Sequence, residues 1–255
     1  MGRSLPEMDA WDSVFDDTYL QTYLHQSDPD QSRQEALAAV ALAAVEPGAE
    51  VLDCPCGFGR HALPLAEAGY RVTACDRSES QLAEAERRRG DAEWPHFVRA
   101  DYRELPFEDA SFDAVFNLFS SLGYLGRDGD VGVLRELRRV LRPGGRLVVE
   151  TAHRDGFARF SQPFARRTWD RLPDGSLYLE ERTPDWAAGT IDTYRLIVSP
   201  TNERVERPYV IHVYSVKEWV EMLEEAGFTE VGAFGGWDGV SPISPDAWRL
   251  ILRAR

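Results

Sequence analysis

The sequence predicts an α/β fold: a largely parallel sheet with helices on both faces, followed by an antiparallel β insertion. From residue 50 to residue 151, short apolar runs alternate with helical patterns, which is typical of parallel strands joined by helices. From residue 163 to residue 214 the helical patterns stop. Strand-like runs follow one another there across short polar turns, as in an antiparallel meander.

The first part of the chain contains five predicted strands. Each is an apolar run bounded by turn residues, and together they cover residues 50–54, 71–76, 96–101, 112–117 and 145–151. Helical patterns lie between them at residues 61–69, 80–89 and 130–141. An earlier helix is predicted to begin at Ser32, because Ser32 and Glu35 form a capping-box pattern ahead of an apolar stripe. The same pattern recurs at Ser78 with Gln81 and at Ser215 with Glu218.

The later part of the chain contains the insertion, a further helix and two more strands. The insertion has three predicted strands, at residues 176–183, 189–199 and 208–215. A helix runs from Ser215 to about Ala226 and ends at Gly227, and strands at residues 229–235 and 247–255 follow it. This pattern divides the chain into an N-terminal helical segment (1–30), a main domain (31–162 and 215–255) and the insertion (163–214).

The composition excludes several classes of function. Acidic residues outnumber basic ones 43 to 29, so the net charge of −14 repels polyanions, and nucleic acid is not expected as a partner. Cys54 and Cys56 form an isolated Cys-x-Cys, which is a poor metal signature, so we expect no metal. The longest aliphatic stretch has ten residues, and the acidic N-terminus does not resemble a signal peptide. We expect a cytoplasmic protein with no membrane partner.

The stretch "VLDCPCGFGRHA", residues 51–62, predicts a nucleotide-type binding loop. Its Gly57-x-Gly59-x-x-Ala62 spacing fits a dinucleotide fingerprint, and Asp76 stands 19 residues after Gly57, where an acid binds ribose hydroxyls. Asp53, however, precedes the loop, and a carboxylate there would repel a pyrophosphate and attract a cation. S-adenosylmethionine carries an ammonium and a sulfonium and no phosphate. The loop therefore favours S-adenosylmethionine, with an NAD-dependent oxidoreductase or a non-catalytic cofactor-binding module as alternatives.

Five motifs in order resemble those of the class I S-adenosylmethionine-dependent methyltransferases. They are "VLDCPCGFGRHA", Asp76 in "VTACDRS", Asp101 in "RADYRELPF", "FDAVFNLFSSLGYL" and "LRPGGRLVVE", although Pro55 stands where many members have glycine. The stretch "NLFSSLGYL" and the inserted sheet are similar to a narrower group, the sugar-amine N,N-dimethyltransferases. The resemblance implies a Rossmann-like, seven-stranded sheet with the β insertion after strand 5. It also implies methyl transfer to nitrogen or oxygen of a small molecule.

The resemblance also implies a set of cofactor-binding residues. Asp76 would hold the ribose hydroxyls and Asp101 the adenine amino group, while the backbone carbonyls of Asn117 and Leu118 would lie near the methyl group. An ordinary strand end is the alternative for each of these positions. The full expected set is Tyr23, Asp53, Gly57, Gly59, Arg60, Asp76, Arg77, Asp101, Tyr102, Asn117 and Leu118.

Two further candidates concern catalysis and the acceptor. Trp11, Phe15, Tyr19 and Tyr23 recur every four residues along one side of a helix, either as a core-facing stripe or as a lid over the cofactor. In the lid, Tyr19 would face the reacting groups. His153, just past strand 5, is either a general base or a solvated loop histidine. The insertion is expected to form a wall of the acceptor pocket, or else a homodimer contact.

Overall fold

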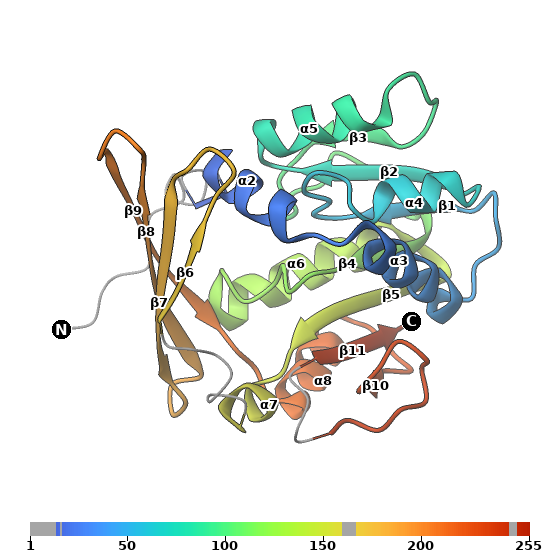
Figure 1. The fold of residues 1–255 in the computed structure, drawn as a ribbon. Coiled ribbons are helices and arrows are strands. Elements are labelled where there is room, and N and C mark those ends of the chain that lie inside the picture. Colours follow the sequence, from blue (N-terminus) through green and yellow to red (C-terminus); the bar gives the residue numbers. More distant parts are fainter. Residues whose placement is uncertain (1–13, 16, 160–166, 245–248) are drawn as a thin grey trace.

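The computed structural model describes residues 14–15, 17–159, 167–244 and 249–255, and its main element is a seven-stranded sheet (Figure 1). The strand order is β10-β11-β5-β4-β1-β2-β3. Strands β1 to β5 are parallel to one another. Strand β11 is antiparallel to β5, and β10 is antiparallel to β11. The strands are β1 (Glu50–Asp53), β2 (Arg71–Asp76), β3 (His96–Arg99), β4 (Phe112–Asn117), β5 (Leu141–Ala152), β10 (Gly232–Phe234) and β11 (Arg249–Ala254). The predicted seven-stranded sheet is confirmed.

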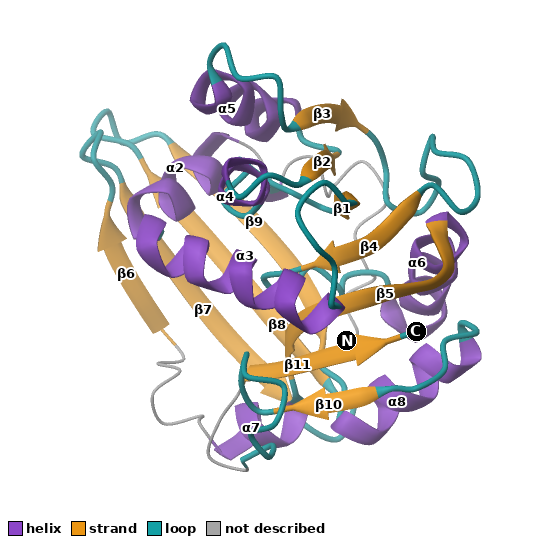
Figure 2. Ribbon diagram, turned by 90° about the vertical axis from the view of Figure 1, so that its right-hand side faces the viewer, coloured by secondary structure: helices purple, strands orange, loops and turns teal. Residues whose placement is uncertain are grey.

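Helices cover both faces of this sheet (Figure 2). The helices α3 (Pro29–Ala43), α4 (Ala62–Glu67) and α5 (Glu79–Arg89) pack on one face, and α6 (Gly126–Val140) and α8 (Val216–Glu225) pack on the other. Successive residues of a strand point to opposite faces of the sheet. Val51 therefore packs in the core under α3 and α4, whereas Leu52 packs in the core under α6 and α8, and neither side chain is exposed. Apolar residues at consecutive positions are therefore needed, as in other sheets buried on both faces.

The start of α3 differs from the prediction. Asp28, not Ser32, is the N-cap: its Oδ1 accepts hydrogen bonds from the backbone N–H groups of Asp30 (2.9 Å) and Gln31 (3.4 Å), and Pro29 is the first helical residue. Ser32 and Glu35 consequently lie inside the helix, and both are buried. The capping residues predicted for α5 and α8, Ser78 and Ser215, do cap those helices.

The insertion forms a separate four-stranded antiparallel sheet that follows β5 and α7 (Arg154–Arg159). It consists of β6 (Arg167–Arg171), β7 (Leu177–Asp185), β8 (Thr190–Val198) and β9 (Arg204–His212). The sequence did not predict β6, an edge strand whose residues "RTWDR" are mostly polar. Helix α2 (Asp17–Gln26) lies between this sheet and the main sheet (Figure 1). None of the helices in the described ranges is long and apolar enough to cross a membrane.

Gly123 joins the loop after β4 to the last strand of the insertion. Its carbonyl accepts a hydrogen bond from the His212 N–H (2.7 Å), and its own N–H donates to Asp130 Oδ1 (3.1 Å). The hydroxyl of Tyr214 donates to the other oxygen of Asp130 (2.6 Å). Gly123 has φ of +106°, and a Cβ at this position would lie 2.4 Å from the carbonyl oxygen of His212. Only glycine fits this junction.

Replacing Gly123 by Ala should therefore lower the free energy of unfolding by about 1–3 kcal/mol, because the side chain is strained in φ and collides with backbone. Urea denaturation would measure the change. Gly132→Ala is the matched control: Gly132 lies within α6 with no atom within 4 Å of the added Cβ, so that variant should be neutral or more stable. Equal stability of the two variants would contradict this account of the junction.

Candidate active site

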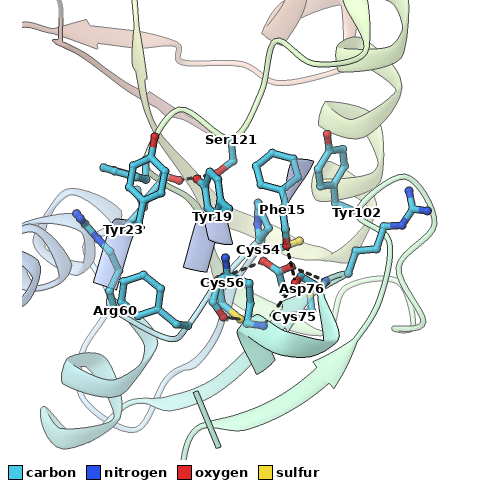
Figure 3. Close-up of a pocket in the computed structure, with 18 of the residues that line it drawn as sticks. Phe15, Tyr19, Tyr23, Cys54, Cys56, Arg60, Cys75, Asp76, Tyr102 and Ser121 are labelled. Carbon is cyan, nitrogen blue, oxygen red and sulfur yellow. Dashed lines mark hydrogen bonds between the residues drawn. The ribbon is translucent and has the colours of Figure 1, made fainter. Parts of the chain in front are cut away.

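A cavity of about 550 Å³ lies at the carboxyl ends of β1 to β4, under α2 (Figure 3). The chain leaves β1 toward β2 on one side, while β4 lies on the other side of β1. Such a switch point opens a crevice at the carboxyl ends of the strands, where ligands of α/β sheets bind. The cavity walls come from α2, from the loop after β1, from the ends of β2 and β3, and from the loop after β4.

The two glycines of the loop after β1 have different environments. Both have positive φ, +54° at Gly57 and +77° at Gly59. Gly57 lines the cavity, and a Cβ there would meet only the Gln81 side chain, at 3.5 Å. Gly59 is not among the lining residues, and its Cβ would lie 3.3 Å from both Ala85 and the Phe97 ring. Gly59 thus allows the loop to pack closely on α5 and β3, and the structure does not bring it to the cavity as predicted.

Asp76 lies at the end of β2 and lines the cavity. Its Oδ2 accepts a hydrogen bond from the Gly57 N–H and its Oδ1 from the Ser78 N–H, both at 2.8 Å. Burial raises the pKa of this carboxyl group, while the two N–H groups oppose that shift. Each oxygen keeps a lone pair, so the carboxylate can accept further hydrogen bonds from a ligand diol.

Asp101 is the second carboxylate of the cavity wall, just after β3. It accepts hydrogen bonds from the Arg103 backbone N–H (2.9 Å) and from Arg103 Nε (2.8 Å), and Arg77 lies 3.8 Å away. These contacts lower its pKa, with the Arg103 side chain as the largest cause. Arg77 and Tyr102 also line the cavity. The predicted acids of β2 and β3 therefore face the same cavity.

Neither Asp53 nor Asn117 is among the residues that line the cavity. Asp53 is 1% exposed, and its Oδ2 has no hydrogen-bond partner among the described residues. Burial raises its pKa to about 8. The Asn117 side chain donates to the Cys54 carbonyl (2.8 Å) and thereby fastens the loop after β1, while Leu118 does line the cavity. The prediction that the Asp53 side chain borders the ligand is corrected, whereas the prediction for Asn117 concerned its backbone carbonyl and stays a prediction.

One end of the cavity is aromatic. Five lining side chains form a continuous chain of rings, with neighbouring centroids 4.3 to 5.5 Å apart: Phe119, Tyr23, Tyr19, Phe15 and Tyr124. Burial raises the pKa of Tyr19, Tyr23 and Tyr124, so these hydroxyls stay protonated. Trp11 lies outside the described residues. The sequence pattern missed Phe119 and Tyr124, although both belong to "NLFSSLGYL".

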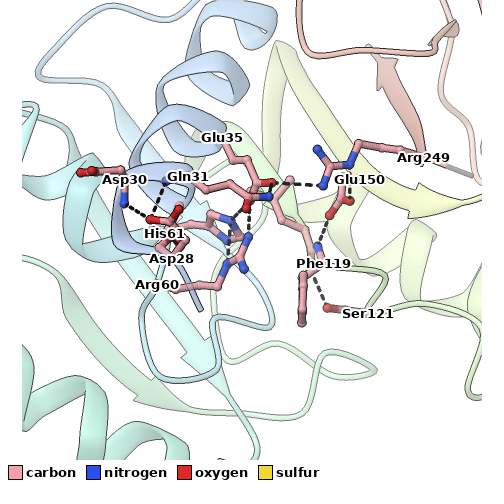
Figure 4. Close-up of polar contacts among 12 residues, drawn as sticks. Asp28, Asp30, Gln31, Glu35, Arg60, His61, Phe119, Ser121, Glu150 and Arg249 are labelled. Carbon is pink, nitrogen blue, oxygen red and sulfur yellow. Dashed lines mark hydrogen bonds and ion pairs between the residues drawn. The ribbon is translucent and has the colours of Figure 1, made fainter. Parts of the chain in front are cut away.

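A buried ionic cluster lies next to the aromatic end (Figure 4). The guanidinium of Arg60 stacks on the Phe119 ring, 4.5 Å from its centroid, and forms an ion pair with Glu35. His61 contacts the same carboxylate at 3.3 Å, and burial lowers the histidine pKa to about 4, so the ring is neutral at pH 7. Sequence patterns assigned Glu35 to a capping box and therefore missed this role.

His153 does not reach the cavity. It is 2% exposed, is not among the lining residues, and its Nδ1 accepts a hydrogen bond from the Gly156 N–H (3.2 Å) at the start of α7. A general base must be within reach of its substrate, so this prediction is corrected. No described group of three or more His, Cys, Asp or Glu side chains is arranged to hold a metal ion.

The insertion also differs from its predicted role. Among the described residues, none from the four-stranded sheet lines the cavity. Its inner face instead supports α2: Arg195, paired with Glu180 at 3.1 Å, lies 5.5 Å from the centroid of the Tyr19 ring. The ring of Tyr209 in β9 also contacts the aromatic wall, with its centroid 6.4 Å from that of Tyr124. The insertion thus backs the aromatic wall from outside.

Comparison with known proteins agrees with this geometry. A family model described as a methyltransferase domain matches residues 51–145, from β1 into β5. The demethylmenaquinone methyltransferase of Streptomyces griseus is 32% identical over 167 residues, which are 61% of this chain and 70% of that protein. This chain belongs to the class I S-adenosylmethionine-dependent methyltransferases. The shared region is the one that carries Gly57, Asp76 and Asp101.

Other members of this methyltransferase family extend the comparison. The chain spans 60% of the demethylmenaquinone methyltransferase of Beutenbergia cavernae, with 38% identity over 151 residues, 55% of this chain. The CcbJ methyltransferase from Streptomyces caelestis has 26% identity and a TM-score of 0.70, with 89% and 90% of the two chains covered. An amino pentose methyltransferase from Micromonospora echinaspora, solved with S-adenosylmethionine bound, shares the fold (18% identity, TM-score 0.66, both chains fully covered).

Proposed function

We propose that this methyltransferase transfers the methyl group of S-adenosylmethionine to nitrogen or oxygen of a small-molecule acceptor. The observation that carries the proposal is a cavity lined by two chemically distinct groups of residues. Asp76 and Asp101 form the acidic group, which would hold the ribose hydroxyls and the adenine. The chain of five aromatic rings forms the other group, along which acceptor and methyl group would meet. S-adenosylmethionine supplies an electrophilic methyl carbon when it is bound.

The residues of the aromatic end favour an acceptor that needs no strong base. Burial raises the pKa of Tyr19 and of Tyr23, so both hydroxyls remain protonated at neutral pH and neither can act as a general base. His61 is neutral, but its Nε2 faces Arg60 and Glu35. Methyl transfer depends mainly on alignment and on the exclusion of water, and an aromatic wall contributes to both. An amine with a free lone pair therefore fits this wall better than a hydroxyl group that must lose a proton.

The experiment that tests the function measures cofactor binding and turnover separately. In calorimetry, S-adenosylhomocysteine should bind with micromolar-range affinity and NAD should not compete. Labelled S-adenosylmethionine should then methylate members of an amine and hydroxyl acceptor panel. Binding of NAD without S-adenosylhomocysteine would overturn the cofactor. Binding with no turnover on any acceptor would favour the non-catalytic alternative.

The domain roles are also proposals. We infer that residues 1–30 act as a lid, since Tyr19 and Tyr23 of α2 cover the cavity. The insertion, residues 163–214, would then hold the lid in place through Arg195. Homodimerisation through this sheet stays a prediction, which light scattering of the purified protein would test.

A further inference from the structure

Two consecutive residues after β4 adopt a backbone conformation that their side chains disfavour. Phe119 has φ of +65° and Ser120 has φ of +53°, and neither is glycine. Left-handed conformations are uncommon for such residues and concentrate at functional sites, where surrounding contacts maintain them. Both residues line the cavity. The contacts that hold this pair therefore act on the shape of the site.

A single residue of β5 holds both backbone N–H groups. Glu150, 2% exposed, accepts a hydrogen bond from the Phe119 N–H on its carboxylate Oε2 (2.6 Å). Its backbone carbonyl accepts a second hydrogen bond from the Ser120 N–H (3.0 Å). Burial raises the pKa of Glu150, while the charge of Arg249 and the Phe119 N–H favour its ionised form. In that form the hydrogen bond from Phe119 is charge-assisted and strong.

The same carboxylate belongs to a circuit of contacts that returns to Phe119 (Figure 4). Oε1 of Glu150 lies 3.3 Å from Nε of Arg249, and Nη2 of Arg249 lies 3.2 Å from Oε1 of Glu35. Glu35 in turn pairs with Arg60, whose guanidinium stacks on the Phe119 ring. The circuit thus begins at the backbone of Phe119 and ends at its side chain. Each of the two acidic side chains in the circuit thus faces a guanidinium group, as a buried acid requires if it is to ionise.

Phe119 is placed by this circuit as a wall of the cavity rather than as part of the core. Its side chain is 42% exposed although it is large and apolar, and it meets Tyr23 edge-on with centroids 5.5 Å apart. Glu150, Arg249 and Glu35 are not among the lining residues. They can therefore affect the acceptor only through the lining residues that they contact, among which Phe119 and Arg60 belong to the circuit.

We propose that Glu150 is a positioning residue for methyl transfer: it holds Phe119 and Ser120 in the left-handed conformation that sets the Phe119 ring against the acceptor. The expected effect on turnover rests on the proposed function. The effect of Glu150 on the backbone conformation of Phe119 and Ser120 does not. The acceptor side of the cavity should depend on Glu150. The cofactor side, formed by Asp76 and Asp101, should not.

Glu150→Gln tests the proposal, because glutamine keeps the size of the side chain and removes its charge. We expect faster amide hydrogen exchange at Phe119 and Ser120, and a loss of about tenfold or more in kcat/KM for the acceptor that the panel identifies. The Kd of S-adenosylhomocysteine should stay within about threefold of wild type, a change smaller than one charged hydrogen bond. Glu136→Gln is the matched control: Glu136 also accepts a backbone N–H, that of Leu105 (2.7 Å), and also pairs with an arginine. It should change none of the three measurements.

A second variant separates positioning from general destabilisation. Ser120→Gly, added to Glu150→Gln, lets residue 120 adopt its conformation without strain and should restore part of the lost kcat/KM. The proposal would be overturned if Glu150→Gln kept the wild-type rate of amide hydrogen exchange and the wild-type kcat/KM. It would also be overturned if Ser120→Gly did not reduce the loss of kcat/KM in Glu150→Gln. If wild-type protein binds no S-adenosylhomocysteine, the proposed function fails instead. In that case the amide hydrogen exchange of Phe119 and Ser120 still tests whether Glu150 fixes their backbone. An unchanged rate in Glu150→Gln would refute this role, and a faster rate would support it.

Discussion

Asp76→Ala is expected to weaken S-adenosylhomocysteine binding by about ten- to a hundredfold. Hydrogen bonds to a charged group contribute roughly 1.5–3 kcal/mol each, and the variant would lose those to the ribose hydroxyls. It would also leave the N–H groups of Gly57 and Ser78, now 2.8 Å from the carboxylate, without their acceptor. The glycine loop and the start of α5 would lose their common anchor. Titration calorimetry measures the change in Kd.

The control for Asp76 is another strand carboxylate with a similar local role. Asp113 in β4 accepts the backbone N–H of Glu50 (2.9 Å) and pairs with Arg142, but it is not among the residues that line the cavity. Asp113→Ala should leave the Kd of S-adenosylhomocysteine unchanged. An Asp76→Ala protein with native circular dichroism and a wild-type Kd would place the ribose elsewhere.

Glu35→Ala is expected to lower the free energy of unfolding by about 3 kcal/mol, since breaking a buried ion pair leaves uncompensated charge. The carboxylate is 4% exposed and serves four side chains: Gln31, Arg60, His61 and Arg249. Without it, the guanidinium groups of Arg60 and Arg249 each lose an ion pair. Urea denaturation at pH 7 gives the difference.

The chain offers a matched control for Glu35. Arg33 and Glu67 join α3 to α4 at 2.6 Å, but their side chains are 48% and 66% exposed. Exposed pairs contribute at most about 1 kcal/mol, so Glu67→Ala should have a small effect. A loss in Glu35→Ala no larger than in Glu67→Ala would show that the buried cluster does not stabilise the fold.

The effect of Glu35 should also depend on pH. Burial alone would raise the pKa of Glu35, but hydrogen bonds from His61 and Gln31 and the charge of Arg60 outweigh it and lower the pKa from 4.5 to about 2. A carboxyl group whose pKa falls on folding stabilises the fold fully above its unfolded pKa. This contribution is lost as the pH falls toward 2. The difference in stability between wild type and Glu35→Ala should therefore narrow between pH 4.5 and pH 2.

Local patterns predicted the elements where one signal dominated. The apolar runs of β1, β2 and β4 and the caps of α5 and α8 needed only neighbouring residues to be recognised. At α3 two capping signals competed, and Asp28 with Pro29 begins the helix one turn before Ser32. The polar edge strand β6 carried no apolar alternation at all.

The sequence by itself determined the α/β class, the positions of most strands along the chain and the two cavity carboxylates, Asp76 and Asp101. Strand ends of a parallel sheet meet at one edge, so a motif at each end is enough to bring those acids together. Only the tertiary structure decided that Asp53 and His153 lie away from the cavity and that Glu35, Arg249 and Glu150 form a circuit around Phe119. The physical reason is that burial and ion pairing depend on which distant segments pack together, and neither spacing nor residue type along the chain encodes that distance.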